Sequence, residues 1–323
     1  MTYTSGSLIQ AADFNAFAGN INALWGTTVS GSQGWGQANI AFVNTSGVVT
    51  ATNWATLVNN LATASNQTGQ AITSRTAPVT GNVVAILANV ATDISSLTTS
   101  SANAVASGTQ YTGWTGTSSK TSATGSGSTP WTITFTHTMT WASADAARYF
   151  WNAGGLVKWQ TSKTADTTAA DTEWNDLANT LVGAIYISNG AGTQTIASVP
   201  YTGTTKIGGT GTPTTLLTTV GWYDLTTTDT TIYKQFADTS PYTGQYIQIN
   251  AKTAGSGTQL VLTTTWVDPG GSTTGSSDDI SGGTATTGIT FGTAPATVVT
   301  YFPPSTTYLT NSWGTPTVAA TVA

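Results

Sequence analysis

The chain contains a single histidine, His137, whose chemistry can be judged from its neighbours. It alternates with Phe135 and Met139 on one side of a predicted strand, so it is expected to pack as a core or interface side chain. A lone histidine in a chain without cysteine cannot complete a zinc site of the usual nitrogen and sulfur kind. No Gly-x-Ser-x-Gly turn accompanies it, so a Ser-His-Asp triad is not indicated.

Carboxylates could act as general acids and bases, but the sequence places few of them together. Glu173, the only glutamate, lies within one helical turn of Asp171 and Asp176. A glycosidase needs two carboxylates that face each other across a cleft, and nothing in this spacing selects such a pair. We interpret the three residues as a hydrated helix N-terminus, where negative charge suits the helix dipole. No catalytic residue is predicted, and the chain is not expected to be an enzyme.

Two other kinds of segment contain residues that could bind a metal ion or a phosphate. Asp268, Asp278 and Asp279 lie in one predicted loop and could supply oxygen ligands to Ca²⁺. Their spacing does not match an EF-hand, so a hydrated loop is the preferred interpretation. The glycine-rich stretch 208–211 lacks the lysine that a phosphate-binding loop requires. We therefore expect no cofactor and no bound metal.

Aromatic side chains beside hydroxyls and amides offer a second kind of binding chemistry. Four such residues stand among polar loop residues: Trp114, Tyr301, Tyr308 and Trp313. Exposed rings in these surroundings can stack on sugars, which makes the four residues candidate glycan contacts. The same rings could instead anchor loops or fill subunit interfaces. The sequence leaves both interpretations open.

The composition restricts the class of protein. Of 323 residues, 39% are apolar and only 7% are charged, whereas roughly 25% are charged in an average globular chain. Hydroxyls and amides must therefore supply the surface, and such a surface associates easily. The eight lysines and arginines are scattered, which argues against nucleic-acid binding because phosphates require clustered cations. Neither a secretion signal nor a membrane span is expected. These features favour an assembled structural protein or an extracellular one.

The longest predicted strand, residues 131–141, has two chemically different faces. Its odd positions are large and mostly apolar and its even positions are threonine, so an apolar face opposes a hydroxyl face. A helix at 143–153 and a strand at 156–159 follow it, and a second helix is predicted to end at Gly183. Turn residues separate further predicted strands at 184–188, 216–223, 230–236, 246–251, 259–267, 287–291 and 297–302.

The first hundred residues predict three helices. Residues 9–17 and 49–57 repeat one pattern, and a third helix is expected at about 82–106, with Thr50 and Asn82 as N-caps. Apolar residues at helical spacing make candidate docking or oligomerisation faces: Phe14, Phe17, Ile21, Trp54, Leu57, Leu61, Leu87, Val90 and Ile94. Plain core packing would explain the same spacing. Packing against another subunit stays open because short helices are marginal alone.

These elements divide the chain into three parts. Residues 1–107 are expected to form the helical docking or oligomerisation module. Residues 108–130 are predicted to be a linker rich in serine, threonine and glycine. Residues 131–323 then form a β-rich domain. The expected fold class is α+β, in which a small N-terminal helical module precedes a β-sandwich-like body that carries two short helices.

Three segments carry a resemblance. The first segment contains three short motifs: residues 9–17, Leu-Trp-Gly at 24–26 and Gly-Trp-Gly-Gln at 34–37. The second is the repeat at 49–57, and the third is Ala-Ser-Ala-Asp-Ala-Ala-Arg-Tyr-Phe-Trp-Asn-Ala-Gly-Gly at 142–155. Together they resemble structural proteins of tailed bacteriophages of aquatic bacteria and cyanobacteria, which are usually described as tail fibre or virion structural proteins. The resemblance touches about half of the chain. It implies a virion component and carries over no catalytic residue.

The predicted function is a non-enzymatic structural component of a tailed phage virion, in the tail, baseplate or fibre. Such a protein would assemble in the host cytoplasm as a homo-oligomer, for example a trimer, and dock through its N-terminal part onto other virion proteins. It would then reside in the extracellular particle. Two alternatives are an adhesin that binds carbohydrates on the host surface, with host glycans as partners, and a capsid decoration protein.

Overall fold

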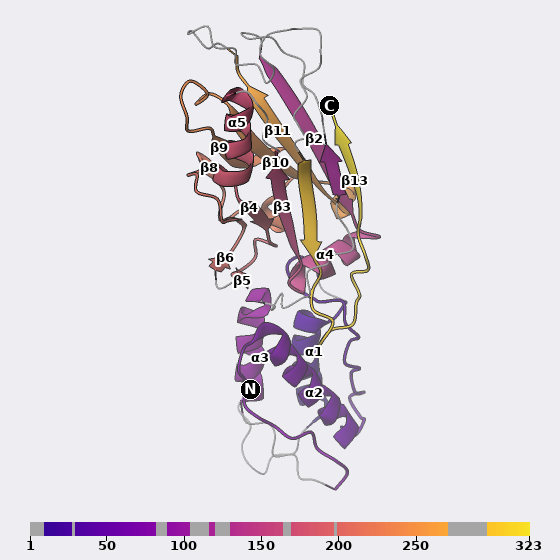
Figure 1. Cartoon of the computed structure of the whole chain (residues 1–323). Coiled ribbons are helices and arrows are strands. Elements are labelled where there is room, and N and C mark those ends of the chain that lie inside the picture. Colours follow the sequence, from indigo (N-terminus) through magenta and orange to yellow (C-terminus); the bar gives the residue numbers. More distant parts are fainter. Residues whose placement is uncertain are drawn as a thin grey trace.

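The computed structural model describes residues 10–27, 30–81, 89–103, 116–119, 130–163, 169–196, 199–270 and 296–323. Helices occupy the N-terminal part and antiparallel sheets form the body, so the predicted α+β class is confirmed. In Figure 1 the helical region, coloured indigo to purple, lies at one end of an elongated sheet body. The predicted domain boundaries near residues 107 and 130 stay predictions.

The helical region packs three α-helices against one another. They are α1 (Ala11–Trp25), α2 (Ala51–Thr68) and α3 (Val90–Thr99), and the 3₁₀ turn η1 (Ser101–Asn103) follows. Thr50 caps α2 as predicted, because its hydroxyl accepts from the Asn53 amide at 3.3 Å while the Asn53 side chain accepts from the Thr50 amide at 2.9 Å. The third helix ends at Thr99, earlier than predicted. Its predicted cap, Asn82, lies outside the described residues.

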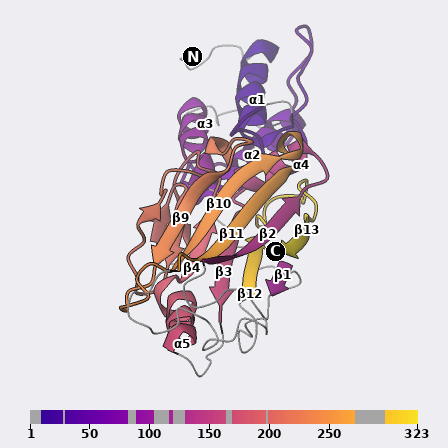
Figure 2. The ribbon, with the colours of Figure 1, turned by 90° about the horizontal axis from the view of Figure 1, so that it is seen from above.

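Two large antiparallel sheets form the body. The first has the strand order β1 (Gly116–Ser119), β12 (Ala296–Phe302), β3 (Leu156–Ser162), β4 (Ala184–Ile187), β7 (Thr204–Ile207). The second has the order β13 (Thr317–Val322), β2 (Trp131–Thr140), β11 (Gln259–Asp268), β10 (Tyr246–Ala254), β9 (Thr230–Phe236), β8 (Thr215–Leu216). A small hairpin pairs β5 (Gln194–Ile196) with β6 (Val199–Tyr201). Figure 2 shows the second sheet as a broad band in front of β3 and β4.

The two sheets approach each other along both edges, so the body resembles a flattened barrel. The amides of Gly203 and Thr204, at the start of β7, donate to the carbonyls of Thr218 and Leu217 at 2.9 and 3.3 Å. Leu217 directly follows β8, so these bonds join the two sheets. At the opposite edge β1, which falls inside the predicted linker, lies beside β13. Joined edges leave fewer backbone groups open to unwanted strand pairing.

Two short helices accompany the sheets, as predicted. The first is α4 (Ala144–Asn152), and the Ser143 hydroxyl caps it by accepting from the Ala146 amide at 3.0 Å. The second is α5 (Ala169–Asp176), which continues into the π-helical turn η2 (Leu177–Leu181). Gly183 follows with a φ of +71°, a conformation that favours glycine, and it ends the helix as predicted.

The central strand β2 confirms the predicted alternation. Its odd-numbered side chains from Trp131 to Met139 are buried, and its threonines are half-buried or exposed. The buried face belongs to a core rich in tryptophan, where Trp266 of β11 stacks on Trp174 of α5 with 5.3 Å between the ring centroids. A hydrogen bond also crosses between the sheets, from Nε1 of Trp159 on β3 to Oγ1 of Thr264 on β11, at 2.9 Å.

The strand predicted at 216–223 is wrong. β8 stops at Leu216, and the chain turns before the 3₁₀ turn η3 (Trp222–Asp224). The turn has a steric reason, because it brings the backbone of Gly221 against Gly190. A Cβ atom added to Gly221 would lie 2.3 Å from the Gly190 nitrogen. A continuous strand could not make this close approach.

The other strand predictions have different outcomes. The predicted hairpin around residues 255–257 is confirmed, since β10 pairs with β11 on either side of the turn η4 (Gly255–Gly257). The strand predicted at 287–291 lies outside the described residues. No prediction included β13, whose sequence does not alternate between polar and apolar residues. β13 nevertheless pairs with β2 in full register, from Thr317 opposite Thr140 to Val322 opposite Phe135.

Paired substitutions on β11 test the alternation and the bond between the sheets. Thr264→Val leaves the buried Trp159 indole without its acceptor, so we expect the free energy of unfolding to fall by about 1–3 kcal/mol. Thr265→Val, the same change on the outer face of the same strand, should alter stability by less than about 0.5 kcal/mol. Urea denaturation followed by tryptophan fluorescence measures both values. Equal effects of the two substitutions would contradict the assignment.

Candidate functional site: the joint between helices and sheets

Two segments that carry the resemblance lie against each other although they are far apart in the sequence. They are residue 27 with the loop at residues 30–37, after α1, and the helix α4 of the body. Residues 310–312, between β12 and β13, complete the contact, and we call the three segments together the joint. Figure 1 shows the chain after β12 descending to the helical region and then returning to β13.

Asn152, at the end of α4, gathers the loop backbone around one amide group. Its Nδ2 donates to the carbonyl oxygens of Gly31, Gln33 and Gly34 at 3.2, 2.8 and 3.1 Å. Its Oδ1 accepts from the Tyr223 hydroxyl at 2.7 Å, and that hydroxyl also lies 2.9 Å from the Gly31 carbonyl oxygen. Asn152 is only 2% exposed. A buried amide in this position satisfies carbonyls that would otherwise lose water without replacement.

Arg148, one turn earlier on α4, adds a charged donor to the same loop. Its guanidinium donates to the Gln33 carbonyl at 2.8 Å and to the Thr27 carbonyl at 3.4 Å. An ion pair with Asp145 at 3.0 Å and a position 4.6 Å from the centroid of the Tyr149 ring hold the guanidinium in place. Burial raises the pKa of Tyr149, and the positive charge of Arg148 partly opposes that rise.

The third segment of the joint comes from the C-terminal part of the chain. The Gln37 side chain pairs with the backbone of Thr310, donating to its carbonyl at 2.9 Å and accepting from its amide at 2.8 Å. The Ser312 hydroxyl donates to the Trp35 carbonyl at 2.9 Å. From α2, the Gln67 amide donates to the Ala153 carbonyl at 3.0 Å. The helical region is therefore fastened to the body from several directions.

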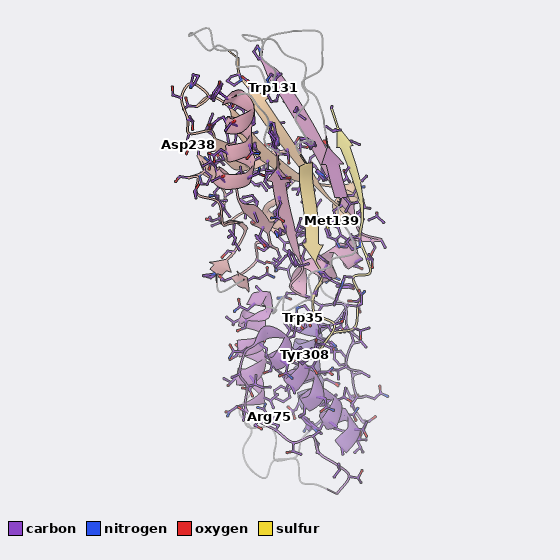
Figure 3. The ribbon with its side chains drawn as sticks, viewed as in Figure 1. Trp35, Arg75, Trp131, Met139, Asp238 and Tyr308 are labelled. Carbon is purple, nitrogen blue, oxygen red and sulfur yellow. The ribbon has the colours of Figure 1, made fainter. Side chains whose placement is uncertain are left out.

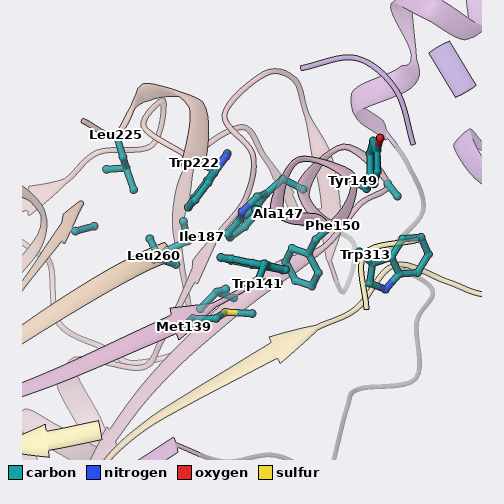
Figure 4. Close-up of a cluster of buried hydrophobic side chains, with 14 of the residues drawn as sticks. Met139, Trp141, Ala147, Tyr149, Phe150, Ile187, Trp222, Leu225, Leu260 and Trp313 are labelled. Atoms are coloured by element: carbon teal, nitrogen blue, oxygen red, sulfur yellow. The ribbon is translucent and has the colours of Figure 1, made fainter. Parts of the chain in front are cut away.

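An aromatic cluster lies beneath these polar contacts. Trp151 of α4 stacks on Trp222 with 5.4 Å between centroids and 17° between planes, and both pack against Trp141. Figure 4 shows the cluster extending past Phe150 to Trp313. The same continuous core includes Trp35 of the loop and the apolar faces of the three helices. Buried hydrophobic contact therefore runs without interruption from one part of the chain into the other.

Gly36 sits where the joint is tightest. Its φ of +70° favours glycine, and an added Cβ atom would lie 2.4 Å from Cδ2 of Tyr149 and 2.5 Å from the Ser312 hydroxyl oxygen. The Gly-Trp-Gly sequence thus combines a buried tryptophan with a backbone that must pass close to α4. The described contacts of the joint are hydrogen bonds to backbone groups and buried aromatic packing.

The predicted docking stripes are buried within the single chain. Eight of the nine candidate residues are at most 5% exposed: Phe14, Phe17, Ile21, Trp54, Leu57, Leu61, Val90 and Ile94. Leu87 lies outside the described residues. Phe14 meets Trp54 edge-on at 5.3 Å, which shows how the helices fill one another's grooves. The core packing of one chain accounts for these stripes, so any docking surface must use other side chains.

The candidate glycan aromatics separate into different environments. Trp313 is only 1% exposed, so its expected place on the surface is wrong, because it fills the aromatic cluster of the joint. Tyr308 is 42% exposed and is labelled in Figure 3 near Trp35, where the helical region meets the body. Trp114 lies outside the described residues. Tyr301 belongs to β12, but its side chain is outside the described part.

The ionisable candidates show no arrangement of catalytic groups in the described residues. His137 is 1% exposed inside the core. Carboxylate oxygens of Glu173, Asp176 and Asp238 lie within 4.8 Å of one another. The predicted hydration of Glu173 is wrong, because its side chain is 5% exposed and accepts from the Thr239 amide at 3.4 Å. Asp268 is buried, and its carboxylate accepts from the Gln245 side chain at 3.0 Å and from the Gly270 amide at 2.8 Å. Both carboxylate oxygens of Asp268 therefore accept hydrogen bonds from the protein itself.

Sequence reasoning missed the roles of the polar residues in the joint. Arg148, Asn152 and Gln37 all lie in the segments that carry the resemblance, yet no contact was predicted for them. The available signal was in the order of the residues. In Arg-Tyr-Phe-Trp-Asn, polar residues flank three aromatic residues, and glycines follow shortly after. That signal indicates side-chain donors next to backbone carbonyls that lack partners within the loop, but it does not say which carbonyls these are.

Comparison with models of known protein families, with curated proteins and with solved structures finds no match to this chain. Within the described part of the chain, no helix combines the length and the apolar character needed to cross a bilayer.

Two glycine substitutions separate backbone strain from crowding in the joint. Gly36→Ala should lower the free energy of unfolding by about 2–4 kcal/mol, because it adds overpacking to an unfavourable φ. Gly314→Ala has a similar φ of +68° but open space around the new methyl group, so it should cost only about 1–2 kcal/mol. Thermal and urea denaturation provide the comparison. Similar losses in both variants would show that Gly36 is not crowded.

Alkaline titration tests the burial of Tyr223. Burial raises its pKa above the ordinary value, so the unfolded state loses this proton first. The stability that this group contributes is therefore present below about pH 10 and lost as the pH rises further. Above pH 10 the free energy of unfolding should fall less steeply in Tyr223→Phe than in the wild type, by about 1.4 kcal/mol per pH unit. At neutral pH the substitution should lower the free energy of unfolding, because it removes a hydrogen bond of the joint. Urea denaturation from neutral pH to pH 11 measures the slope, and an unchanged slope would contradict the assignment.

Proposed function

We propose that this chain is a non-enzymatic structural component of a tailed phage virion, in the tail, baseplate or fibre. The observation that carries the proposal is the joint. The segments at 34–37 and 142–155, which resemble such proteins, use their distinctive side chains to hold the helical region to the sheet body. A resemblance that includes the segments of a rigid connection suits a protein whose role is to keep two parts in a fixed relation.

The physical character of the joint supports this role. Arg148, Asn152 and Gln37 direct their donors at backbone carbonyls, and a continuous aromatic core lies beneath them. Displacing the helical region would leave buried donors and acceptors unpaired and would expose tryptophan, so small rotations are strongly opposed. A particle component that carries load or sets the spacing of its neighbours needs this resistance. A hinge would instead need few buried contacts.

The composition supports assembly with copies of itself and with other virion proteins. A surface with so few charges offers weak electrostatic resistance to association. The stripes predicted for docking are used inside the chain, so the proposed oligomer must form through other surfaces. The alternatives of an adhesin and a capsid decoration protein share the same composition, and they differ in where the protein would sit on the particle and what it would touch.

Immunogold electron microscopy locates the protein. Particles are produced from the genome that encodes the chain, and an antibody raised against the purified protein is applied. We expect gold on the tail or on its distal end. Gold distributed over the head would support the decoration alternative instead. Mass spectrometry of the purified particles is the companion measurement, and absence of the chain from particles that contain the other virion proteins would overturn the proposal.

A further inference from the structure

The helical region meets the body at a second place, apart from the joint. The hairpin of β5 and β6 belongs to neither large sheet, because among the described strands these two pair only with each other. Figure 1 shows this hairpin at the end of the body that faces the helical region. There β5 lies against the turn η1, which follows α3. We call this meeting of β5 and η1 the hairpin contact.

The base of the hairpin is held firmly by the body. The Ser188 hydroxyl donates to the Thr202 carbonyl at 2.6 Å, and the Ser188 amide donates to the Gly203 carbonyl at 3.3 Å. Asn189, the next residue, is 1% exposed and donates from Nδ2 to the Trp151 carbonyl at 3.3 Å. Hydrogen bonds therefore fix the two ends of the hairpin, and its position on η1 depends on the contacts made beyond them.

Beyond this base, one buried side chain of β5 lacks hydrogen bonds. Gln194 is 2% exposed, yet neither its Nε2 nor its Oε1 has a hydrogen-bond partner within the described part of the chain. Taking an amide out of water without replacing its hydrogen bonds is unfavourable, by a factor of about ten or more in the equilibrium. The amide would regain water if β5 moved away from η1. The closed contact therefore carries a penalty that an open hairpin does not.

The chain also passes very close to η1 two residues before Gln194. A Cβ atom added to Gly192 would lie 2.2 Å from Cβ of Ala102 in η1, a distance that real side chains avoid. Glycine at this position therefore lets the hairpin approach η1 so closely. Because a single added methyl group would overfill the space, the hairpin contact can be disturbed without altering any hydrogen bond.

The hairpin contact differs in kind from the joint. In the joint, Asn152 donates to three loop carbonyls and Gln37 pairs with both backbone groups of Thr310, so separation would break these hydrogen bonds. At the hairpin contact, separation would break no hydrogen bond of the Gln194 side chain and would return its amide to water. A local opening therefore costs less free energy here than a displacement at the joint.

We infer that the β5–β6 hairpin is a releasable arm, which closes on η1 and lifts away from it while the joint stays closed. The unpaired Gln194 amide keeps the closed position only marginally favourable. An apolar side chain of similar size would make closure firmer, so a glutamine here suits a contact that must open again. Opening uncovers β5 and η1 together. The inference goes beyond the proposed function, because it concerns a motion of the isolated chain.

Hydrogen exchange of the full chain, measured by mass spectrometry, tests the arm. In the wild type, the amides of β5 and β6 should exchange at least about tenfold faster than those of β10 and β11. Gln194→Leu should slow exchange in the hairpin at least about tenfold, because it removes two unpaired polar atoms from the closed contact. Gln67→Leu removes a buried amide that donates to the Ala153 carbonyl, so it should instead speed exchange in the joint.

A pair of substitutions tests the close approach to η1. Gly192→Ala should speed exchange in the hairpin at least about tenfold, because the new methyl group meets Ala102. Adding Ala102→Gly to this variant should return the rate to within about threefold of that in Ala102→Gly alone. Exchange at residues 30–37 of the joint should stay as in the wild type in these variants.

Three results overturn the inference. The first is a wild-type hairpin whose amides exchange as slowly as those of β10 and β11, which would mean that it does not open locally. The second is unchanged or faster hairpin exchange in Gln194→Leu, which would mean that the glutamine amide is satisfied in the closed position. The third is an effect of Gly192→Ala that survives Ala102→Gly, which would place the crowding away from η1.

Discussion

The structure depends on how the carbonyl groups of one glycine-rich loop are satisfied. Residues 31–34 form no helix or strand, so their inward-facing carbonyls cannot be paired within the loop. The Asn152 amide reaches three of them, and the Tyr223 hydroxyl lies between that amide and Gly31. This capture lets Trp35 enter the core, and Trp35 in turn places Gln37 against the C-terminal segment. The Gln67 amide and the continuous aromatic core hold the same two parts together from other sides.

The aromatic core explains why three short helices can be stable in this setting. Isolated helices of this length are marginal, and most of their stability comes from the burial of an apolar face. Here the buried faces of α1, α2 and α3 join a cluster that continues through Trp35 into the tryptophans of the body. The two parts therefore contribute to one hydrophobic core, although they differ in secondary structure. A shared core and directed hydrogen bonds act together, because the core holds the parts in contact and the hydrogen bonds select one orientation.

Charged residues are distributed unevenly between the two ends of the molecule. One end is helical and nearly neutral, since residues 1–103 contain only three charged side chains. The other end is a closed pair of sheets that carries most of the charge. Repulsion between like charges is therefore weaker at the helical end than at the sheet end. The threonine face of β2 fits this arrangement, since hydroxyls keep a sheet surface hydrated without adding charge.

The sequence by itself determined the features that depend on near neighbours. The alternation in residues 131–141 defined β2 and its buried face, and Thr50 defined the start of α2, because strand period and helix capping act over a few residues. Only the tertiary structure decided that the apolar stripes pack inside one chain, that Trp313 is buried, and that Gln37 pairs with Thr310. β13 likewise became a strand through pairing with β2 rather than through its own pattern. These outcomes depend on partners far along the chain, and no local periodicity specifies which of several apolar or polar surfaces will meet.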